Sequence, residues 1–506
     1  MRLTDTQSRI IFGLSFLGSA FLQFWRISTW SFWFDESYTS ALVHTDPAQI
    51  IKLTSLDVHP PLYYLVLHGW TQLFGTSDLA MRSLSALLML FSILILVLLL
   101  KKLVEKRLAY VAASFAALAP FTIRYGQEAR MYAMVSALIL SATYIFIIQI
   151  QRKRRERSVK LWMAYALLMT LALYTHYFSV LILAAHLSYA LFHDTRTKDG
   201  KTWLIRLKNR ISLIDRRFLK SLFIIPILYI PWMPTLLDQF RSVNQGFWIP
   251  DADYVSLASV FSTLTIFEEI GEFGLPLVLT YLIAFAFSFV TYRVVRKVGG
   301  DDSRALWFVL ACFLFPLLVL FLVSLLPFTS SYFYFRYFAQ FSMFFYAGIV
   351  LVGMLAIKHL NQIIGWSMFL LVIGLNLVGT ARVLNGVDKS GVDVNLKFAQ
   401  LEEAFVEGDE IVAMSMWQWF NAHHYNTTST TVKYADTGYY FGSHAPIYES
   451  KENILVHRDL NTIDPASGRV WVIEPTNFTT TIPDNWHRTM QSIYGRDTNM
   501  ILYEVR

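Results

Sequence analysis

Two adjacent carboxylates stand in the stretch Trp33-Phe34-Asp35-Glu36-Ser37-Tyr38, directly after the first apolar segment of the chain. Carboxylates beside a membrane-length apolar run are costly to bring near hydrocarbon, so we expect them at an interface where a reaction or an ion needs them. A second polar stretch, Asp57-Val58-His59-Pro60-Pro61, follows in the same loop. We take these two stretches as the candidate site and the rest of the chain as the scaffold that positions them.

The composition sets the class of protein. Hydrophobic residues make up 55% of the 506 residues and aromatic residues 16%, and the mean hydropathy is +0.44. These values exclude an ordinary soluble chain and indicate a polytopic α-helical membrane protein. The only cysteine, Cys312, lies inside an apolar run, so no disulfide forms within the chain and we interpret it as a packing residue.

The charge is distributed unevenly along the chain. Residues 1–379 carry 33 Lys and Arg against 20 Asp and Glu, whereas residues 380–506 carry 10 against 16. A basic membrane region followed by an acidic tail indicates two regions with different locations or roles. We therefore predict a transmembrane domain over residues 1–380, with its first outer loop at 26–79, and a C-terminal domain over residues 381–506.

The hydropathy pattern predicts eleven membrane-crossing helices. They are Ile10–Trp25, Ala80–Leu100, Leu108–Ile123, Met131–Ile150, Leu161–Tyr174, Tyr177–Phe192, Ser221–Leu237, Leu275–Val295, Ala305–Pro327, Tyr337–Ile357 and Ile363–Thr380. The first has no small-residue cleavage site behind it, so we expect it to remain as an anchor.

A twelfth apolar segment, Pro60–Phe74, is excluded from this set because it is shorter than a bilayer requires and contains His68 and Gln72. If it does not cross and the N-terminus is cytoplasmic, 26 Lys and Arg lie in inner loops and seven in outer loops before residue 380. If it crossed, this bias would reverse. The segment is therefore predicted to be a re-entrant or surface-lying helix on the outer face.

This topology places the unusual residues at helix ends on the outer, extracytoplasmic face. They are Asp35, Glu36, His59, Arg82, Arg124, Glu128, Arg130, His176, the acidic loop 238–272 and Arg336. The inner face holds basic connectors such as Arg152-Lys153-Arg154-Arg155, which we interpret as topology signals in contact with anionic lipids and not as a nucleic-acid site.

The C-terminal region has a different pattern. Residues 408–415, 468–474 and 500–505 are enriched in β-branched residues between turn residues, and Leu396–Val406 and Gln418–Tyr425 have helical spacing. We predict a small α/β domain on the extracytoplasmic face.

The ordered motifs WFDES, DVHPPLYY, FGTSDLAMRSLSA, IRYGQEARMYAM, LYTHYFS and IPWMP resemble those of the bacterial polyprenyl-phosphate-sugar-dependent glycosyltransferases of the GT-C superfamily. The nearest relatives are the dolichyl-phosphate-mannose protein mannosyltransferases and the lipid A aminoarabinose transferases. The likeness covers roughly residues 1–240. It implies a helical bundle whose first outer loop carries the Asp-Glu pair over a lipid-facing cavity. It also implies transfer of one sugar from a lipid phosphate to a lipid, glycan or protein acceptor.

Such a reaction needs a base for the acceptor hydroxyl and cations for the departing phosphate. We expect Asp35 to be the base, with Glu36 orienting it or taking its place. Two aromatic side chains precede Asp35 and shield it from water, and the resemblance assigns the catalytic role to the first acid of the pair. The simpler alternative is that both acids only stabilise the start of a helix.

Arginine is suited to the phosphate because its planar group donates two hydrogen bonds to one anion. The candidates are Arg130, Arg82, Arg124, His59 and Arg336. Arg130 ranks first because it matches the Glu-Ala-Arg-x-Tyr segment of the relatives. His59 contacts phosphate or caps the following helix, while Arg124 and Arg336 bind phosphate or extend to lipid headgroups. Glu128, Tyr132 and His176 are expected to support the site.

A divalent metal ion stays open but is not required. Asp35, Glu36, Glu128 and His176 offer oxygen and nitrogen ligands, but the sequence has no close-spaced ligand motif. Two other classes also stay open. A secondary transporter predicts inverted repeats and mid-membrane ionisable residues, which the sequence does not show. A lipid-linked polysaccharide polymerase or ligase typically places its arginines in a large late loop, whereas here the motifs lie in the first.

Overall fold

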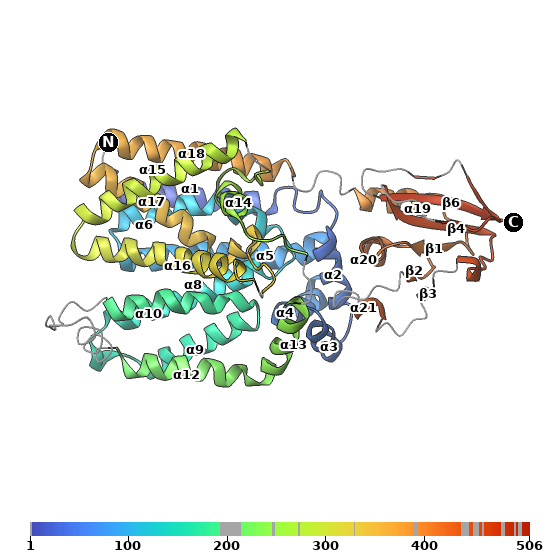
Figure 1. Ribbon diagram of the computed structural model, residues 1–506, viewed down its shortest axis with the longest axis horizontal. Coiled ribbons are helices and arrows are strands. Elements are labelled where there is room, and N and C mark those ends of the chain that lie inside the picture. The colour runs from blue at the N-terminus through green and yellow to red at the C-terminus, as the bar shows by residue number, and fades with distance from the viewer. Residues whose placement is uncertain are drawn as a thin grey trace. The chain divides into compact units, whose positions relative to one another are not determined.

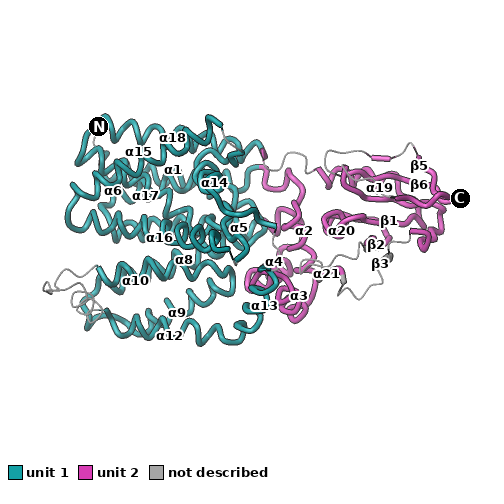
Figure 2. The backbone as a smooth tube through the Cα atoms, in the orientation of Figure 1, with its two compact units in different colours: residues 1–25, 83–385 teal, residues 26–82, 386–506 magenta. Residues whose placement is uncertain are grey.

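The computed structural model describes residues 3–192, 214–244, 248–271, 274–327, 329–387, 393–436, 445–448, 455–457, 460–476, 481–489, 492–493 and 498–506. The chain divides into two compact units. Unit 1 contains residues 1–25 and 83–385, and unit 2 contains residues 26–82 and 386–506 (Figure 2). The first loop and the C-terminal region therefore form one compact unit, a grouping that the sequence did not indicate.

Unit 1 is a bundle of helices (Figure 1). It contains α1 (Asp5–Phe24), most of α5 (Asp78–Leu103), α6 (Lys106–Ala117), α7 (Pro120–Gly126), α8 (Tyr132–Gln151), α9 (Val159–Leu173), α10 (Ile182–Phe192), α12 (Arg216–Tyr229), α13 (Met233–Asn244), α14 (Tyr254–Ile266), α15 (Leu275–Lys297), α16 (Gly300–Ser324), α17 (Ser342–His359) and α18 (Gln362–Leu384). Short 3₁₀ helices include η2 (Tyr177–Leu181), η3 (Ile230–Trp232) and η4 (Phe335–Phe341).

Among the described residues, seven helical segments are long and apolar enough to cross a membrane, or eight if one bent pair counts as a single span. They match seven of the predicted crossings, and the chain is a multi-pass membrane protein. Helix α15 has the exposed apolar surface of a lipid-facing helix, because the side chains of Leu275, Leu282 and Phe285 are all more than half exposed. The total of eleven crossings stays a prediction, since α9 and α10 are shorter apolar helices.

The prediction of one continuous helix over Leu108–Ile123 is wrong. The chain bends by 55° between α6 and α7, where Pro120 occupies the first turn of α7. Proline lacks the N–H that a continuous helix needs and suits a helix start instead. The expected acidic loop 238–272 also contains a helix, α14, which begins at a capping box formed by Asp253 and Ser256.

The first loop, in unit 2, folds into three short helices, α2 (Phe34–Val43), α3 (Pro47–Leu56) and α4 (Leu62–Phe74). Asp46 caps α3 by accepting from the N–H of Gln49, with Pro47 at the first helical position. Helix α4 confirms that the apolar segment after Pro60 is helical. It has 13 residues, and at about 1.5 Å per residue this length is well short of a ~30 Å hydrocarbon core.

The C-terminal part of unit 2 is the α/β domain that the sequence predicts. Its sheet has the order β3-β2-β1-β4-β6-β5, in which β3, β2, β1 and β4 are parallel and the last two pairings antiparallel. The strands are β1 (Glu410–Ala413), β2 (Lys433–Asp436), β3 (Leu455–His457), β4 (Arg469–Pro475), β5 (Trp486–Arg488) and β6 (Thr498–Val505). Helices α19 (Val394–Ala404) and α20 (Met416–Tyr425) match the two predicted helices, and α21 (Ala445–Tyr448) is short.

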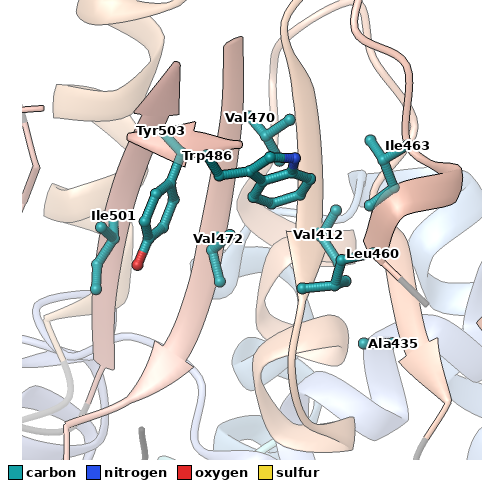
Figure 3. Close-up of a cluster of buried hydrophobic side chains, with 9 residues drawn as sticks. All are labelled: Val412, Ala435, Leu460, Ile463, Val470, Val472, Trp486, Ile501 and Tyr503. Carbon is teal, nitrogen blue, oxygen red and sulfur yellow. The ribbon is translucent and has the colours of Figure 1, made fainter. Parts of the chain in front are cut away.

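One face of this sheet holds a compact apolar core. Val412 of β1, Val470 and Val472 of β4 and Ile501 of β6 alternate with residues of the opposite face and pack together with Trp486 (Figure 3). The opposite face of these strands is buried as well, because Ile411, Trp471, Ile473 and Leu502 have almost no exposed surface.

Candidate active site

The Asp35-Glu36 pair lies in the first turn of α2. Acidic residues at this position are favoured by the partial positive charge of a helix start. No side chain caps α2, whose N-cap residue is Trp33, so the pair contributes through its charge and not as a cap. The two acids differ in environment, because Asp35 is partly exposed whereas Glu36 is fully buried.

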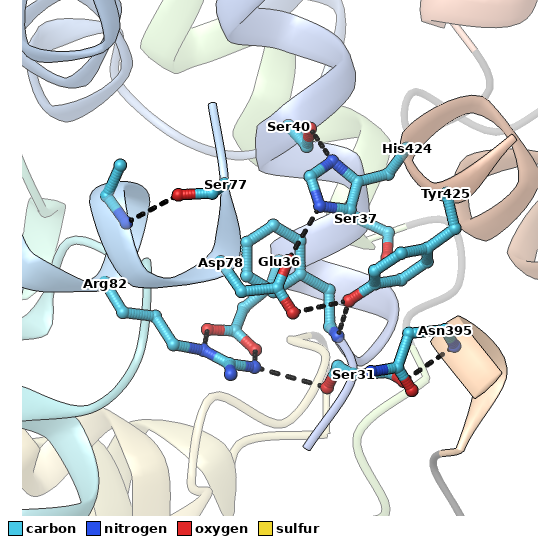
Figure 4. A network of polar contacts seen from close by, with 12 residues as sticks. Ser31, Glu36, Ser37, Ser40, Ser77, Asp78, Arg82, Asn395, His424 and Tyr425 are labelled. Atoms are coloured by element: carbon cyan, nitrogen blue, oxygen red, sulfur yellow. Dashed lines mark hydrogen bonds and ion pairs between the residues drawn. The ribbon is translucent and has the colours of Figure 1, made fainter. Parts of the chain in front are cut away.

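Glu36 is held by Arg82 of α5 in a two-point ion pair. Nε of Arg82 donates to Oε1 of Glu36 over 2.8 Å, and Nη2 donates to Oε2 over 2.6 Å (Figure 4). Both side chains have no exposed surface. A buried pair needs further hydrogen bonds to offset the desolvation of its charges. Arg82 makes them to three backbone carbonyls, those of Ile27, Trp30 and Ser31.

Arg82 therefore does not fit the predicted role of phosphate ligand. A guanidinium has five N–H groups, and Glu36 and the three carbonyls account for all five. The side chain is also stacked over Phe32, 4.8 Å from the ring centre. We correct the prediction: Arg82 fixes the segment that leads into α2 and anchors Glu36, which leaves Asp35 as the accessible acid of the pair.

His59 lies beside Asp57, with Nδ1 of His59 3.3 Å from Oδ2 of Asp57. The alternative that His59 caps the next helix is wrong, because the N-cap of α4 is Pro61 and no side chain bonds there. His59 is 19% exposed. It remains a proposed contact for an anion, with Asp57 orienting its ring.

Six of the predicted site residues lie in unit 1, and the structure gathers them. Arg124 in the last turn of α7 forms a buried ion pair with Glu128. Tyr132, at the start of α8, stacks edge-on against Tyr125 and lies 6.1 Å, ring centre to ring centre, from His176. Arg130 and Arg336 are within electrostatic range of Tyr132. The cluster therefore brings three arginines together with Glu128, Tyr132 and His176.

The turn that carries Glu128 and Arg130 is fixed by its neighbours. Nε2 of Gln127 donates to the carbonyls of Leu22 (2.7 Å) and Trp25 (2.9 Å) at the end of α1. At Gly126 the side chain of Gln23 approaches so closely that a Cβ would lie 1.9 Å from its Oε1. A larger residue at Gly126 would displace the side chain of Gln23, whose Nε2 donates to the carbonyl of Thr122 in α7 over 2.9 Å.

The remaining members surround this turn. His176 accepts from the N–H of Phe178 and lies 3.3 Å from Nε2 of Gln340, and its ring contacts Tyr337. Arg336, in η4, is partly exposed and lies over the rings of Trp248 and Tyr334 at 5.4 and 5.1 Å. These aromatic contacts are an alternative to the predicted headgroup contact, because ring faces attract a guanidinium.

An apolar cavity of about 790 Å³ lies between α14, α15, α16, α17 and α18 of unit 1. Its wall includes Leu279, Phe287 and Phe313, and its polar part includes Glu268 and Glu269. The hydroxyl of Tyr334, whose ring lies under Arg336, donates to Glu269 over 3.4 Å. A long apolar chain fits the apolar walls of this cavity.

Among the residues that the structure describes, no group of three or more His, Cys, Asp or Glu side chains is placed to hold a metal ion. Glu36 and Glu128, two of the four ligands that the sequence suggested, are engaged by Arg82 and Arg124. We carry no metal into the proposals below.

Sequence reasoning missed four residues that surround α2. Asp78 binds His424 and Tyr425 of α20 (Figure 4). Asn421 of α20 binds Ser37. One signal was available: Asp78 and Arg82 are four residues apart on the first turns of α5, so both side chains leave one helix face. No sequence signal linked α20 to the first loop, because the two stretches are more than 300 residues apart in the chain.

One family model matches part of the chain. Residues 58–209 match the family model described as dolichyl-phosphate-mannose-protein mannosyltransferase. No curated protein matches the chain. The matched segment begins in the first loop and includes Arg82, Arg124, Arg130 and His176.

Two solved structures are similar over almost the whole chain. ArnT from Cupriavidus metallidurans in the apo state is 11% identical, with 98% of this chain and 97% of that chain covered and a TM-score of 0.60. The same protein bound to undecaprenyl phosphate is 12% identical, with the same coverage and a TM-score of 0.52. The resemblance expected from the motifs is confirmed at the level of the fold, including the C-terminal domain.

Proposed function

We propose that this chain, which has the fold of the GT-C superfamily glycosyltransferases, transfers a single sugar from a polyprenyl-phosphate donor to an acceptor hydroxyl. The acceptor oxygen forms a bond to the anomeric carbon while the bond from that carbon to the phosphate oxygen breaks. The acceptor proton passes to a carboxylate, and the electron pair leaves on the polyprenyl phosphate. Attack opposite to the departing phosphate inverts the anomeric configuration.

The proposal rests on the different environments of the two adjacent acids. Glu36 is buried and held by Arg82, whereas Asp35, its neighbour in the same helical turn, is partly exposed. A general base must be accessible to the acceptor and held in a fixed place. Because Glu36 is anchored, the helical turn that it shares with Asp35 is held in place. Asp35 has the accessible carboxylate oxygen, so Asp35 is the proposed base.

The arginine cluster of unit 1 is the proposed phosphate site. Arg130 is 2% exposed and Arg124 is 7% exposed, so a phosphate that reaches them is largely removed from water. Charge-assisted hydrogen bonds are stronger in such surroundings. Arg130 is the first choice because it is the more buried of these two arginines and matches the Glu-Ala-Arg-x-Tyr segment of the relatives, and Arg336 is a second. The solved relative binds undecaprenyl phosphate, and the apolar cavity offers room for part of such a chain.

The function is tested on purified protein in lipid nanodiscs with three tritiated donors, undecaprenyl-phosphate mannose, glucose and 4-amino-arabinose. Membrane extract supplies the acceptor. We expect one donor to lose its label to an acceptor, and Asp35→Asn protein to lack this transfer. Uptake of free sugar or lipid precursor by proteoliposomes, with no transfer from any of the donors, would contradict the proposal and favour a transporter.

Arg130→Ala should weaken donor binding or turnover about ten-fold or more, because one buried charge-assisted contact is worth about 1.5–3 kcal/mol. Arg130→Lys should restore only part, since lysine cannot donate the paired hydrogen bonds of arginine. The measurement is the KM and kcat for the active tritiated donor. Arg241→Ala is the matched control, because Arg241 is exposed beside Asp238. Unchanged kinetics in Arg130→Ala would remove this residue from the site.

The orientation of the chain gives a second expected result. Cysteines at Ser55 and Thr76 should react with a membrane-impermeant maleimide on intact cells, and one at Arg155 only after permeabilisation. The buried Cys312 gives little background. Reaction at Ser55 with protection at Thr76 would show that Pro60–Phe74 crosses the membrane and would reverse the predicted orientation of all later helices.

A further inference from the structure

Helix α20 of the C-terminal domain packs directly against α2, the helix that carries Asp35. Phe420 of α20 makes edge contacts with Phe34 and Tyr38 of α2 at 6.0 and 5.4 Å between ring centres. Phe32, just before α2, stacks on His424 at 4.4 Å. Aromatic pairs of this kind contribute beyond the area that they bury. The C-terminal domain therefore supports the first turn of α2.

Asp78, in the first turn of α5, joins that helix to α20 through hydrogen bonds. Its Oδ1 lies 2.9 Å from Nε2 of His424, and its Oδ2 accepts from the hydroxyl of Tyr425 over 2.8 Å (Figure 4). The other ring nitrogen of His424, Nδ1, lies 2.7 Å from Oγ of Ser40 in α2. If Nε2 carries the proton toward Asp78, Nδ1 accepts from Ser40, so one neutral histidine satisfies both contacts.

Tyr425 also holds the backbone in front of α2. Its hydroxyl accepts the N–H of Phe32 over 2.6 Å while it donates to Asp78. Burial and the nearby Asp78 carboxylate raise the pKa of Tyr425, so the hydroxyl keeps its proton as a donor. The result is a chain of hydrogen bonds from the Phe32 backbone through Tyr425 to Asp78.

Two further contacts fix the same segment at other points. Oγ of Ser37 donates to Oδ1 of Asn421 over 2.5 Å. Ser31 and Asn395 bond twice, from Oγ of Ser31 to the amide oxygen over 2.7 Å and from the backbone N–H of Asn395 to Oγ over 3.0 Å. Asp35 thus lies inside a segment that the C-terminal domain holds both before and after it.

We propose that the C-terminal domain is a functional part of the catalytic loop, in which Tyr425 and His424, themselves held by Asp78, are positioning residues for Asp35. The assignment of Asp35 as the residue positioned rests on the proposed function above. The docking of α20 on α2 does not, because it follows from contacts within unit 2 alone. The side chains of Asp78 and Arg82 project from the same face of α5. Arg82 binds Glu36 of α2 and Asp78 binds α20, so the start of α5 supports α2 both directly and through α20.

The expected effect is on turnover and not on donor binding. A displacement of about 1 Å at a reacting group can cost on the order of 10²-fold in rate. Tyr425→Phe removes one hydroxyl, and with it both the bond to Asp78 and the acceptor for the Phe32 N–H. We expect kcat for the active tritiated donor to fall by about ten- to a hundred-fold, with KM changed less than about two-fold.

The test compares Tyr425→Phe with Tyr503→Phe, the same chemical change in β6, where Tyr503 packs in the sheet core beside Trp486. Hydrogen exchange of the intact protein provides a readout that needs no substrate. Amides of residues 32–40 should exchange about ten-fold faster in Tyr425→Phe and be unchanged in Tyr503→Phe. Asp78→Asn should reproduce Tyr425→Phe, and the double variant should lose little more than either, because all act in one network.

The outcomes separate the two proposals. Unchanged exchange at residues 32–40 in Tyr425→Phe would overturn the docking of α20. Faster exchange with normal kcat would overturn the positioning role. A double variant whose loss of kcat equals the product of the losses in Tyr425→Phe and Asp78→Asn would also contradict a shared network. If the wild-type protein transfers none of the sugars, the proposed function fails, and the exchange experiment still decides whether the C-terminal domain holds α2.

Discussion

Asp35→Asn should lose sugar transfer by about 10²–10⁴-fold, the usual contribution of a general base. Asparagine keeps the shape of the side chain but cannot accept the proton of the acceptor hydroxyl. Because Asp35 is partly exposed and Glu36 makes the buried ion pair, the change should leave folding intact. The loss should therefore appear in kcat.

The measurement is transfer from the active tritiated donor by protein that elutes as a single monodisperse species. Binding of undecaprenyl phosphate provides the control, because Asp35→Asn should bind this lipid as the wild type does. Near-normal transfer by Asp35→Asn would end the base assignment. A variant that neither transfers nor binds the lipid would place Asp35 in substrate binding and would equally contradict its role as a base.

Glu36→Gln should cause a different kind of defect from Asp35→Asn. Loss of the Glu36 charge leaves Arg82 buried with only partial compensation. Removing one partner of a buried ion pair typically costs about 3–5 kcal/mol. Glu36→Gln should therefore lower the thermal stability of the detergent-solubilised protein, with activity lost in proportion to the unfolded fraction.

Arg82→Met should be the most destabilising of these changes. It leaves the Glu36 carboxylate without its cation and also removes the donors to the carbonyls of Ile27, Trp30 and Ser31. Each buried group left without a partner costs about 1–3 kcal/mol. The double variant Glu36→Leu with Arg82→Met removes both charges, yet it should not recover wild-type stability, because the three carbonyls stay unsatisfied.

The control for this pair is Arg107→Met. Arg107 contacts Asp5 and Glu105, but all three side chains are at least 44% exposed, and exposed ion pairs contribute about 0–1 kcal/mol. The readout is the midpoint of thermal unfolding of each variant at equal detergent and salt. Full recovery by the double variant would show that the ion pair, and not the carbonyl contacts, is what Arg82 provides.

The sequence determined the class of the protein and much of its local structure. Composition and hydropathy identified a multi-pass membrane chain, and seven of the predicted crossings correspond to long apolar helices among the described residues. Helix α4 and the α/β character of the C-terminal region were also predictable. These features depend on the periodicity and length of apolar segments, which are local properties of the chain.

Only the tertiary structure decided which charged residues are accessible and which are engaged within the protein. Arg82 and Arg130 both lie near helix starts, in motifs that resemble those of the relatives. The sequence could not show that all the N–H groups of the Arg82 guanidinium donate to Glu36 and to backbone carbonyls. Nor could it show that His424 and Tyr425 meet Asp78. A hydrophobic pattern depends on residues that are neighbours in the sequence. The partner of a buried charge depends on which distant segment packs beside it. Such a partner is needed because burying a charge without one has a large desolvation cost.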